Sequence, residues 1–266
     1  MLDQFNREIH YLRISITDRC NLRCTYCMPE EGVPFKPHSA IMSFEEIVEV
    51  VEAAVELGIN KIRLTGGEPL VRKGVVELVR MIKAVDGIKH LGMTTNGVLL
   101  DKMAQPLRDA GMDSVNISLD TLNPERYKEI TRIGDISFTL KGIDAAIAAG
   151  FDKIKINVVV MDNSPDNEIN DMQNFCNEKG LTLQLINHYD LSEEKKNNYK
   201  FDRPPNCAVC NRIRLTADGI LKPCLHSNQE IPVNPDDIIS SLKKTILDKP
   251  EQGSVCTNRS MIEIGG

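Results

Sequence analysis

Six of the eight cysteines in this 266-residue chain fall into two groups of three. The groups are Cys20, Cys24 and Cys27, and Cys207, Cys210 and Cys224. Three thiolates on a short loop can bind three irons of a four-iron cluster and leave the fourth iron open to an exchangeable ligand. An open coordination position is what a catalytic metal site requires. The spacing therefore predicts metal sites near both ends of the chain.

A structural zinc site is the alternative interpretation of each group, and it would need a fourth cysteine or histidine nearby. Within ten residues of the first group the only histidine is His10, whereas His226 could complete a zinc ribbon with the second group. Two cysteines stand apart from both groups. Cys176 lies in a helical stretch and is expected to be a small buried apolar residue, and no role is predicted for Cys256.

Basic residues form a second pattern, because they alternate with apolar residues along β-rich segments. The polar faces of these segments carry four cations and a single carboxylate, at Asp120. The cations are Arg13, Lys61, Arg63 and Lys155. If the apolar faces pack on helices, the polar faces line an interior where desolvated cations need anionic partners. Since arginine suits bidentate contacts to phosphate, the pattern predicts a polyphosphate or carboxylate ligand.

Two other interpretations of the alternation stay open. Alternation is also normal for a sheet that exposes one face to water. Any single cation of the set is equally typical of a salt-bridged surface residue. The helical stretches between the β-rich segments count against an open sheet, because helices would cover it.

The elements that position these residues alternate between strand and helix, which predicts an α/β fold with a parallel sheet. Strands are expected over 11–17, 61–65, 90–95, 114–119, 153–160 and 181–187. Ser43 and Glu46 have capping-box spacing at the start of the first helix, which is expected to stop at Gly58. Six strands are too few for the common eight-stranded barrel, so we expect a partial (β/α)6 barrel. A short C-terminal region is expected to cover its open side.

Composition limits the partners and the location. Residues 190–205 are polar and end in proline, which indicates a linker between a barrel at 1–189 and a metal-binding region at 190–266. The net charge of −6 argues against broad binding of nucleic acid or anionic membranes. No apolar run approaches the roughly 20 residues that span a bilayer, and no export signal is evident. We expect a cytoplasmic protein, with its thiols reduced.

The stretch from Cys20 to Pro29 resembles the signature of the radical S-adenosylmethionine (SAM) superfamily. Residues 65–69, with the sequence TGGEP, look like the glycine-rich motif of that superfamily, and residues 94–97 and 116–120 resemble its later SAM-binding strands. The resemblance implies a four-iron, four-sulfur cluster on the first cysteine group. It also implies a set of SAM-binding residues: Tyr26, Gly66, Gly67, Glu68, Thr94 and Ser118. For Tyr26, simple packing is the alternative.

The second cysteine group, together with the terminus at 259–266, resembles the GTP 3',8-cyclase family of molybdenum cofactor biosynthesis. That resemblance covers almost the whole chain and implies a second four-iron cluster, whose open iron receives the guanine. It implies catalytic roles for Arg13, Gly265 and Gly266, although a frayed terminus is the alternative for the two glycines. The implied GTP-binding residues are Arg13, Lys61, Arg63, Lys155, Arg212 and Arg214.

The chain departs from that family in two ways. Gln184 stands where bacterial cyclases carry an arginine, with Tyr189 near a family methionine, and the segment before Cys207 is short. A radical SAM enzyme with an auxiliary cluster that acts on a peptide or another small metabolite is therefore a second hypothesis, and a non-catalytic zinc or iron protein is a third. Expected partners are GTP or a related anionic small molecule and a flavodoxin-type or other reductant protein. A homodimer is left open.

Overall fold

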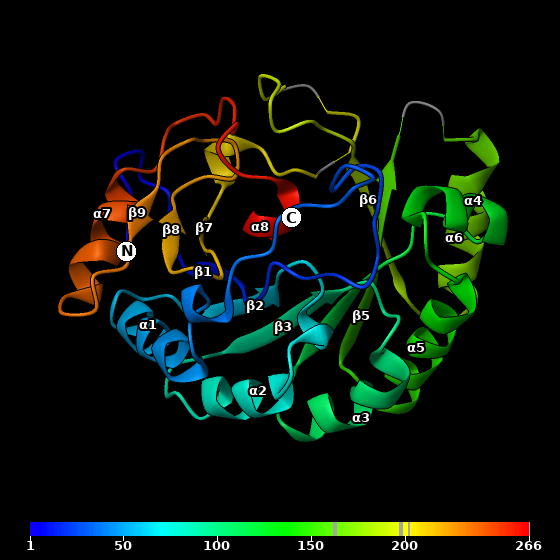
Figure 1. Ribbon diagram of the computed structural model, residues 1–266, viewed down its shortest axis with the longest axis horizontal. Coiled ribbons are helices and arrows are strands. Elements are labelled where there is room, and N and C mark those ends of the chain that lie inside the picture. The colour runs from blue at the N-terminus through cyan, green and yellow to red at the C-terminus, as the bar shows by residue number, and fades with distance from the viewer. Residues whose placement is uncertain (162–163, 197–198, 202, 266) are drawn as a thin grey trace.

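One curved sheet organises the molecule, whose computed structural model describes residues 1–161, 164–196, 199–201 and 203–265 (Figure 1). Within these residues nine strands follow the order β6-β5-β4-β3-β2-β1-β7-β8-β9. Neighbours from β6 to β7 are parallel, and β8 and β9 are antiparallel additions. The strands are β1 (Tyr11–Ser15), β2 (Lys61–Thr65), β3 (His90–Thr95), β4 (Ser114–Ser118), β5 (Lys153–Val160), β6 (Thr182–Asn187), β7 (Arg212–Leu215), β8 (Ile220–Lys222) and β9 (Ile231–Pro232).

Most of the helices lie along the outer side of the curved sheet, whereas α8 lies on its inner side (Figure 1). The α-helices are α1 (Phe44–Glu56), α2 (Val75–Lys83), α3 (Leu100–Asp109), α4 (Pro124–Thr131), α5 (Ile136–Ala148), α6 (Asp166–Glu178), α7 (Ile238–Leu247) and α8 (Met261–Ile264). Short 3-10 helices are η1 (His38–Ala40), η2 (Pro69–Val71) and η3 (Cys207–Val209). Ser43 and Glu46 form the predicted capping box at the start of α1. None of the described helices is long and apolar enough to cross a membrane.

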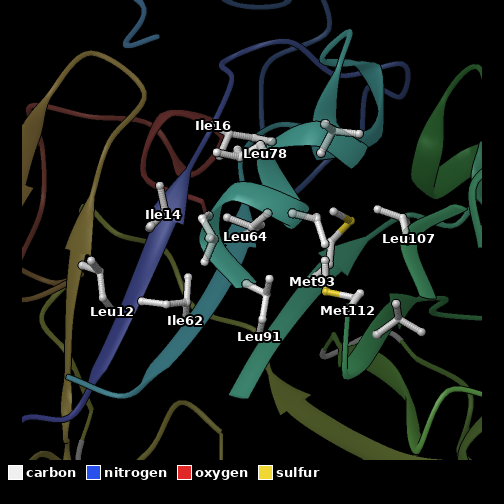
Figure 2. Close-up of a cluster of buried hydrophobic side chains, with 14 of the residues drawn as sticks. Leu12, Ile14, Ile16, Ile62, Leu64, Leu78, Leu91, Met93, Leu107 and Met112 are labelled. Carbon is white, nitrogen blue, oxygen red and sulfur yellow. The ribbon is translucent and has the colours of Figure 1, made fainter. Parts of the chain in front are cut away.

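The apolar faces of the strands pack against these outer helices. Leu12, Ile62 and Leu91, on three neighbouring strands, are fully buried in this layer (Figure 2). They meet α2 and α3 through the equally buried Leu78 and Leu107. Because successive side chains of a strand point to opposite faces, this packing turns the polar residues of each strand toward the inner side. The predicted orientation of the strand faces is thus confirmed.

The six predicted strands are present to within two residues at each end, and the sheet stays open, as expected of a partial barrel. The sequence did not predict β7, which adds a parallel strand beside β1. Since β6 is at one edge and β7 lies beyond β1, the segment 188–211 must cross the width of five strands. This segment covers part of the inner side. The division of the chain at residue 189 stays a prediction.

Candidate functional site

A cavity of about 300 Å³ lies on the inner side of the sheet, and we call it the basic cavity. Ten of the described lysines and arginines line it, and the described part of its lining contains no aspartate or glutamate. The ten are Arg13, Lys61, Arg63, Lys153, Lys155, Lys195, Arg203, Arg212, Arg214 and Lys249. All six residues predicted to bind an anionic substrate are among them. An anionic ligand is the natural partner of such a lining, because buried charges require compensation.

Strand register brings three arginines into one row. Arg214 of β7 and Arg63 of β2 both pair with Arg13 of β1, so their side chains share the inner face. All three are at least nine-tenths buried. Gly92 pairs with Arg63 on the other side, and a Cβ atom there would lie 2.8 Å from Arg63 Nη2. Gly92 thus leaves space that the Arg63 guanidinium occupies.

Tyr11 lies at the centre of this positive charge, two residue pairs along the same strands and on the same face. Its hydroxyl accepts a hydrogen bond from Arg63 Nε at 2.9 Å. Burial alone would raise the pKa of Tyr11, but four cations, Arg63 and Arg13 first, lower it to about 7. Burial, with the neighbouring guanidinium groups, lowers the pKa of Arg13 to about 9. The shift of the pKa of Tyr11 reports a positive potential in the basic cavity, whereas that of Arg13 results first from burial.

At the β5–β6 end of the basic cavity, the strands contribute a network of side-chain amides and no further arginine among the described residues. Gln184 accepts from Lys155 Nζ at 3.2 Å and donates to Asn157 Oδ1 at 3.1 Å. Arg203, from the crossing segment, lines the cavity beside Gln184. The sequence did not predict that Arg203 and Lys195 line the cavity. The segment that carries them has no periodic pattern from which the direction of their side chains could be predicted.

The second cysteine group opens into the same basic cavity. Cys207 begins η3, Cys210 follows it, and Cys224 follows β8. Lys195 Nζ donates to Cys207 Sγ at 2.9 Å. Although burial opposes the shift, Lys249 and Arg212 lower the pKa of Cys210, which favours its thiolate. Thus the structure places three thiols against the wall of the basic cavity.

The first cysteine group lines a neighbouring cavity of about 180 Å³, which we call the cysteine-loop cavity. Five of the six predicted SAM-binding residues also line it: Tyr26, Gly66, Gly67, Thr94 and Ser118. Burial is the largest cause that raises the pKa of Cys20 to about 11 and that of Cys27 to about 12. The two cavities share Asn157, Ile186 and Tyr189 in their linings, so they adjoin.

The glycine-rich turn after β2 is packed against the backbone of the cysteine loop. A Cβ atom on Gly66 would lie 2.6 Å from Thr17 O, and one on Gly67 would lie 2.3 Å from Arg19 O. Either side chain would push the loop away, so glycine is needed at both positions. The turn therefore fixes the distance between the cysteines and the ends of β2 and β3.

Glu68 lies beneath this turn and is absent from the described lining of the cysteine-loop cavity. Its buried carboxylate accepts hydrogen bonds from Thr95 Oγ1 and Asn96 N, both at 2.7 Å, and from Leu70 N. Burial raises the pKa of Glu68 to about 7. These contacts tie the turn to the end of β3, so Glu68 positions the turn.

Asp120, the carboxylate predicted on the inner face, is likewise used for positioning. Tyr26 donates to its Oδ2 at 2.7 Å, and Val159 N donates to its Oδ1 at 2.8 Å. Burial raises the pKa of Asp120 to about 6. The hydrogen bond fixes the Tyr26 ring at the edge of the cysteine-loop cavity. Asp120 is in the described lining of neither cavity.

The C-terminal tail packs against the sheet near the two cavities. Gly265 O accepts hydrogen bonds from Arg214 and, at 3.4 Å, from Arg13. Gly265 has a φ of +72°, and a Cβ atom there would lie 1.9 Å from Thr65 Oγ1. A frayed terminus is therefore wrong for Gly265, whereas Gly266 lies outside the described residues.

The remaining cysteines are away from both cavities. Cys176 is fully buried in the main core, as predicted for a small apolar residue. Cys256 packs with Leu191 and Ile264 in a second, smaller cluster. Among the described residues, no three His, Cys, Asp or Glu side chains are grouped to hold a metal ion.

Several known proteins are similar to this chain in sequence. Residues 14–176 match the radical SAM superfamily. Proteins named GTP 3',8-cyclase from Alkaliphilus oremlandii and Petrotoga mobilis are 41% and 40% identical to the chain, and each alignment covers 100% of both proteins. The first alignment runs over 320 positions, whereas this chain has 266 residues, so at least 54 positions have no residue here.

Solved structures show the same fold at low sequence identity. Streptococcus suis SuiB bound to S-adenosylmethionine matches with a TM-score of 0.71 and 16% identity, over 92% of this chain and 66% of that chain. The protein anSMEcpe with bound AdoMet matches with a TM-score of 0.65 and 19% identity, over 91% of this chain and 80% of that chain. The predicted α/β fold of an open radical SAM barrel is confirmed.

The ionisation of Tyr11 offers a test of the basic cavity. An anion that binds there offsets the cations, so inorganic tripolyphosphate is expected to raise the pKa of Tyr11 above about 7. The measurement is a pH titration of phenolate absorbance in metal-free protein, with Tyr11→Phe to identify the contribution of this residue. Without the anion, phenolate forms as the pH rises through about 7, and with the anion it forms at higher pH. An unchanged titration at saturating tripolyphosphate would mean that the anion binds elsewhere.

Proposed function

This chain belongs to the radical SAM superfamily, and from that premise we propose that it converts GTP to 3',8-cyclo-7,8-dihydro-GTP in molybdenum cofactor biosynthesis. The observation that carries the proposal is the adjoining pair of cavities, one lined by three thiols and the other by ten cations. The full-length similarity to proteins named GTP 3',8-cyclase supports the same assignment.

The cysteine-loop cavity fits a four-iron, four-sulfur cluster with SAM. Cys20, Cys24 and Cys27 would bind three irons, and the positive iron charge would stabilise thiolates that burial otherwise disfavours. The backbone of Gly66 and Gly67 and the side chains that line the cavity would hold SAM. When bound, the cluster and SAM supply a 5'-deoxyadenosyl radical that abstracts hydrogen from the substrate.

The basic cavity would hold the triphosphate and the ribose. The row of Arg13, Arg63 and Arg214 offers forked donors for phosphate oxygens, and Lys61, Lys155 and Arg212 add charge around it. Binding the anion would offset the desolvation of these cations. The buried tail carbonyl of Gly265 holds Arg13 and Arg214 in place. Met261 and Ile262 of the tail line the cysteine-loop cavity, where they would help to exclude water.

We assign a second four-iron cluster to Cys207, Cys210 and Cys224. They line the same cavity as the proposed phosphate-binding cations, so a group held there would meet the substrate. Three thiolates suit a four-iron cluster, because each would bind a different iron and leave the fourth iron open. The flavodoxin-type electron donor and the homodimer stay predictions.

A second candidate function is the modification of a peptide or another small metabolite by the same radical chemistry. Two observations favour it. Gln184, at the position where bacterial cyclases carry an arginine, forms an amide network. In the alignment with the Alkaliphilus oremlandii protein, at least 54 positions have no residue in this chain. Gln184 lies in the wall of the basic cavity, where a different substrate would bind.

Turnover distinguishes the two functions. Anaerobic incubation of the cluster-loaded protein with SAM, dithionite and GTP is expected to consume GTP as 5'-deoxyadenosine forms, because the cavities adjoin. Arg63→Ala should lower kcat/KM for GTP by about tenfold to a hundredfold, since it removes a charge-assisted contact. Arg80→Ala, on the exposed face of α2, is the control. Formation of 5'-deoxyadenosine with no loss of GTP would favour the second candidate.

Metal content tests the two-cluster assignment. The anaerobically reconstituted protein is expected to hold about eight irons with matching sulfide, since each cysteine group suits one four-iron cluster. Cys224→Ser should leave about four irons and retain SAM cleavage, whereas Cys24→Ser should abolish that cleavage. Cys176→Ser is the matched control, because Cys176 lies on α6, buried in the main core and outside both cysteine groups. Zinc without sulfide in the wild-type protein would contradict the assignment.

A further inference from the structure

His226 lines the basic cavity next to Cys224, and its ring has no protein partner in the described part of the chain. The residue is 2% exposed, and neither Nδ1 nor Nε2 has a hydrogen-bond partner there. Buried polar side-chain atoms are nearly always paired in native proteins, because desolvation without a hydrogen bond is unfavourable. Two unpaired nitrogens on the wall of a cavity therefore indicate a ligand that supplies the hydrogen bonds.

Packing holds the ring in place without using its nitrogens. Ser254 N donates to His226 O at 2.9 Å, which fixes the backbone. The ring of Tyr189 lies with its centroid 5.0 Å from that of His226, at an interplanar angle of 50°. On another side, a Cβ atom on Gly253 would lie 2.8 Å from His226 Cβ. The imidazole is thus positioned, and both of its nitrogens remain available to a ligand.

Two imidazoles line the basic cavity. His90 already has a partner, since its Nε2 lies 2.9 Å from Ser114 Oγ, whereas no described residue pairs with the ring of His226. The ten cations of the cavity can donate to phosphate oxygens but cannot accept a hydrogen bond. The side-chain oxygens of Asn157 and Gln184 already accept from neighbouring side chains. A purine base presents N–H groups as well as acceptors along its edge. A neutral imidazole can pair with such an edge through one ring nitrogen, which accepts or donates according to the tautomer.

We propose that His226 determines base specificity by hydrogen bonding to the edge of the purine of a nucleoside triphosphate, while the cations hold its phosphates. This inference rests on the proposed function, because it takes the ligand of the basic cavity to be GTP. It differs from the zinc-ribbon alternative, in which His226 would be a metal ligand beside Cys224.

Binding measurements separate recognition of the base from recognition of the phosphates. The cluster-loaded, full-length protein is titrated anaerobically by calorimetry with GTP and with inorganic tripolyphosphate. His226→Phe keeps an aromatic ring but removes both ring nitrogens and with them the hydrogen bond to the base, so GTP binding is expected to weaken about tenfold or more. Tripolyphosphate binding should not change. His226→Asn, which keeps a donor and an acceptor, should recover part of the loss, and His38→Phe on exposed η1 is the control.

The results of these titrations distinguish the role of His226 from the proposed function of the chain. Selective loss of GTP affinity in His226→Phe supports the inference. Equal GTP affinity in His226→Phe and the wild type overturns the inference and leaves the proposed function standing. Equal loss of GTP and tripolyphosphate, or loss of iron from His226→Phe before any nucleotide is added, also overturns it. A wild-type protein that binds tripolyphosphate but not GTP overturns both the inference and the proposed function.

Discussion

The inner face of the sheet buries positive charge, and the surrounding elements must compensate that charge. Parallel register aligns Arg214, Arg13 and Arg63 on neighbouring strands, all at least nine-tenths buried. Like charges this close repel one another, so the fold must provide oxygen partners or leave room for an anion. Several features meet this need. Gly92 leaves space for one guanidinium, and the tail carbonyl of Gly265 accepts from the other two. Among the residues that the structure describes, no carboxylate lines the cavity and competes for them.

The same constraint links the two cavities. Carboxylates near the cysteine loop are turned away from the cavities, and each fixes a neighbouring element. Glu68 ties the glycine turn to β3, and Asp120 fixes Tyr26. The cysteine loop is thereby held against the ends of β2 and β3, beside a cavity that attracts anions. The shared wall of Asn157, Ile186 and Tyr189 is where a radical generated on one side would meet a substrate held on the other.

Much of this arrangement could be predicted from the sequence, because alternation in a buried parallel sheet determines which face each residue occupies. The inner positions of Arg13, Lys61, Arg63 and Lys155 followed from that rule. The strands β7 to β9 have four, three and two residues, too few for a pattern to emerge. Residues on irregular segments, such as Arg203, could not be placed either, because their direction depends on tertiary packing.

The central claim is that the basic cavity exists to hold a polyphosphate, and calorimetric comparison of guanosine, GDP and GTP tests it most directly. Each added phosphate gains charge-assisted hydrogen bonds from buried cations, so affinity should rise by about tenfold or more with the length of the phosphate chain. High salt should reduce this gain in affinity less than it would reduce the gain from an exposed ion pair, because buried charges are screened little. Equal affinity for guanosine and GTP would contradict the account.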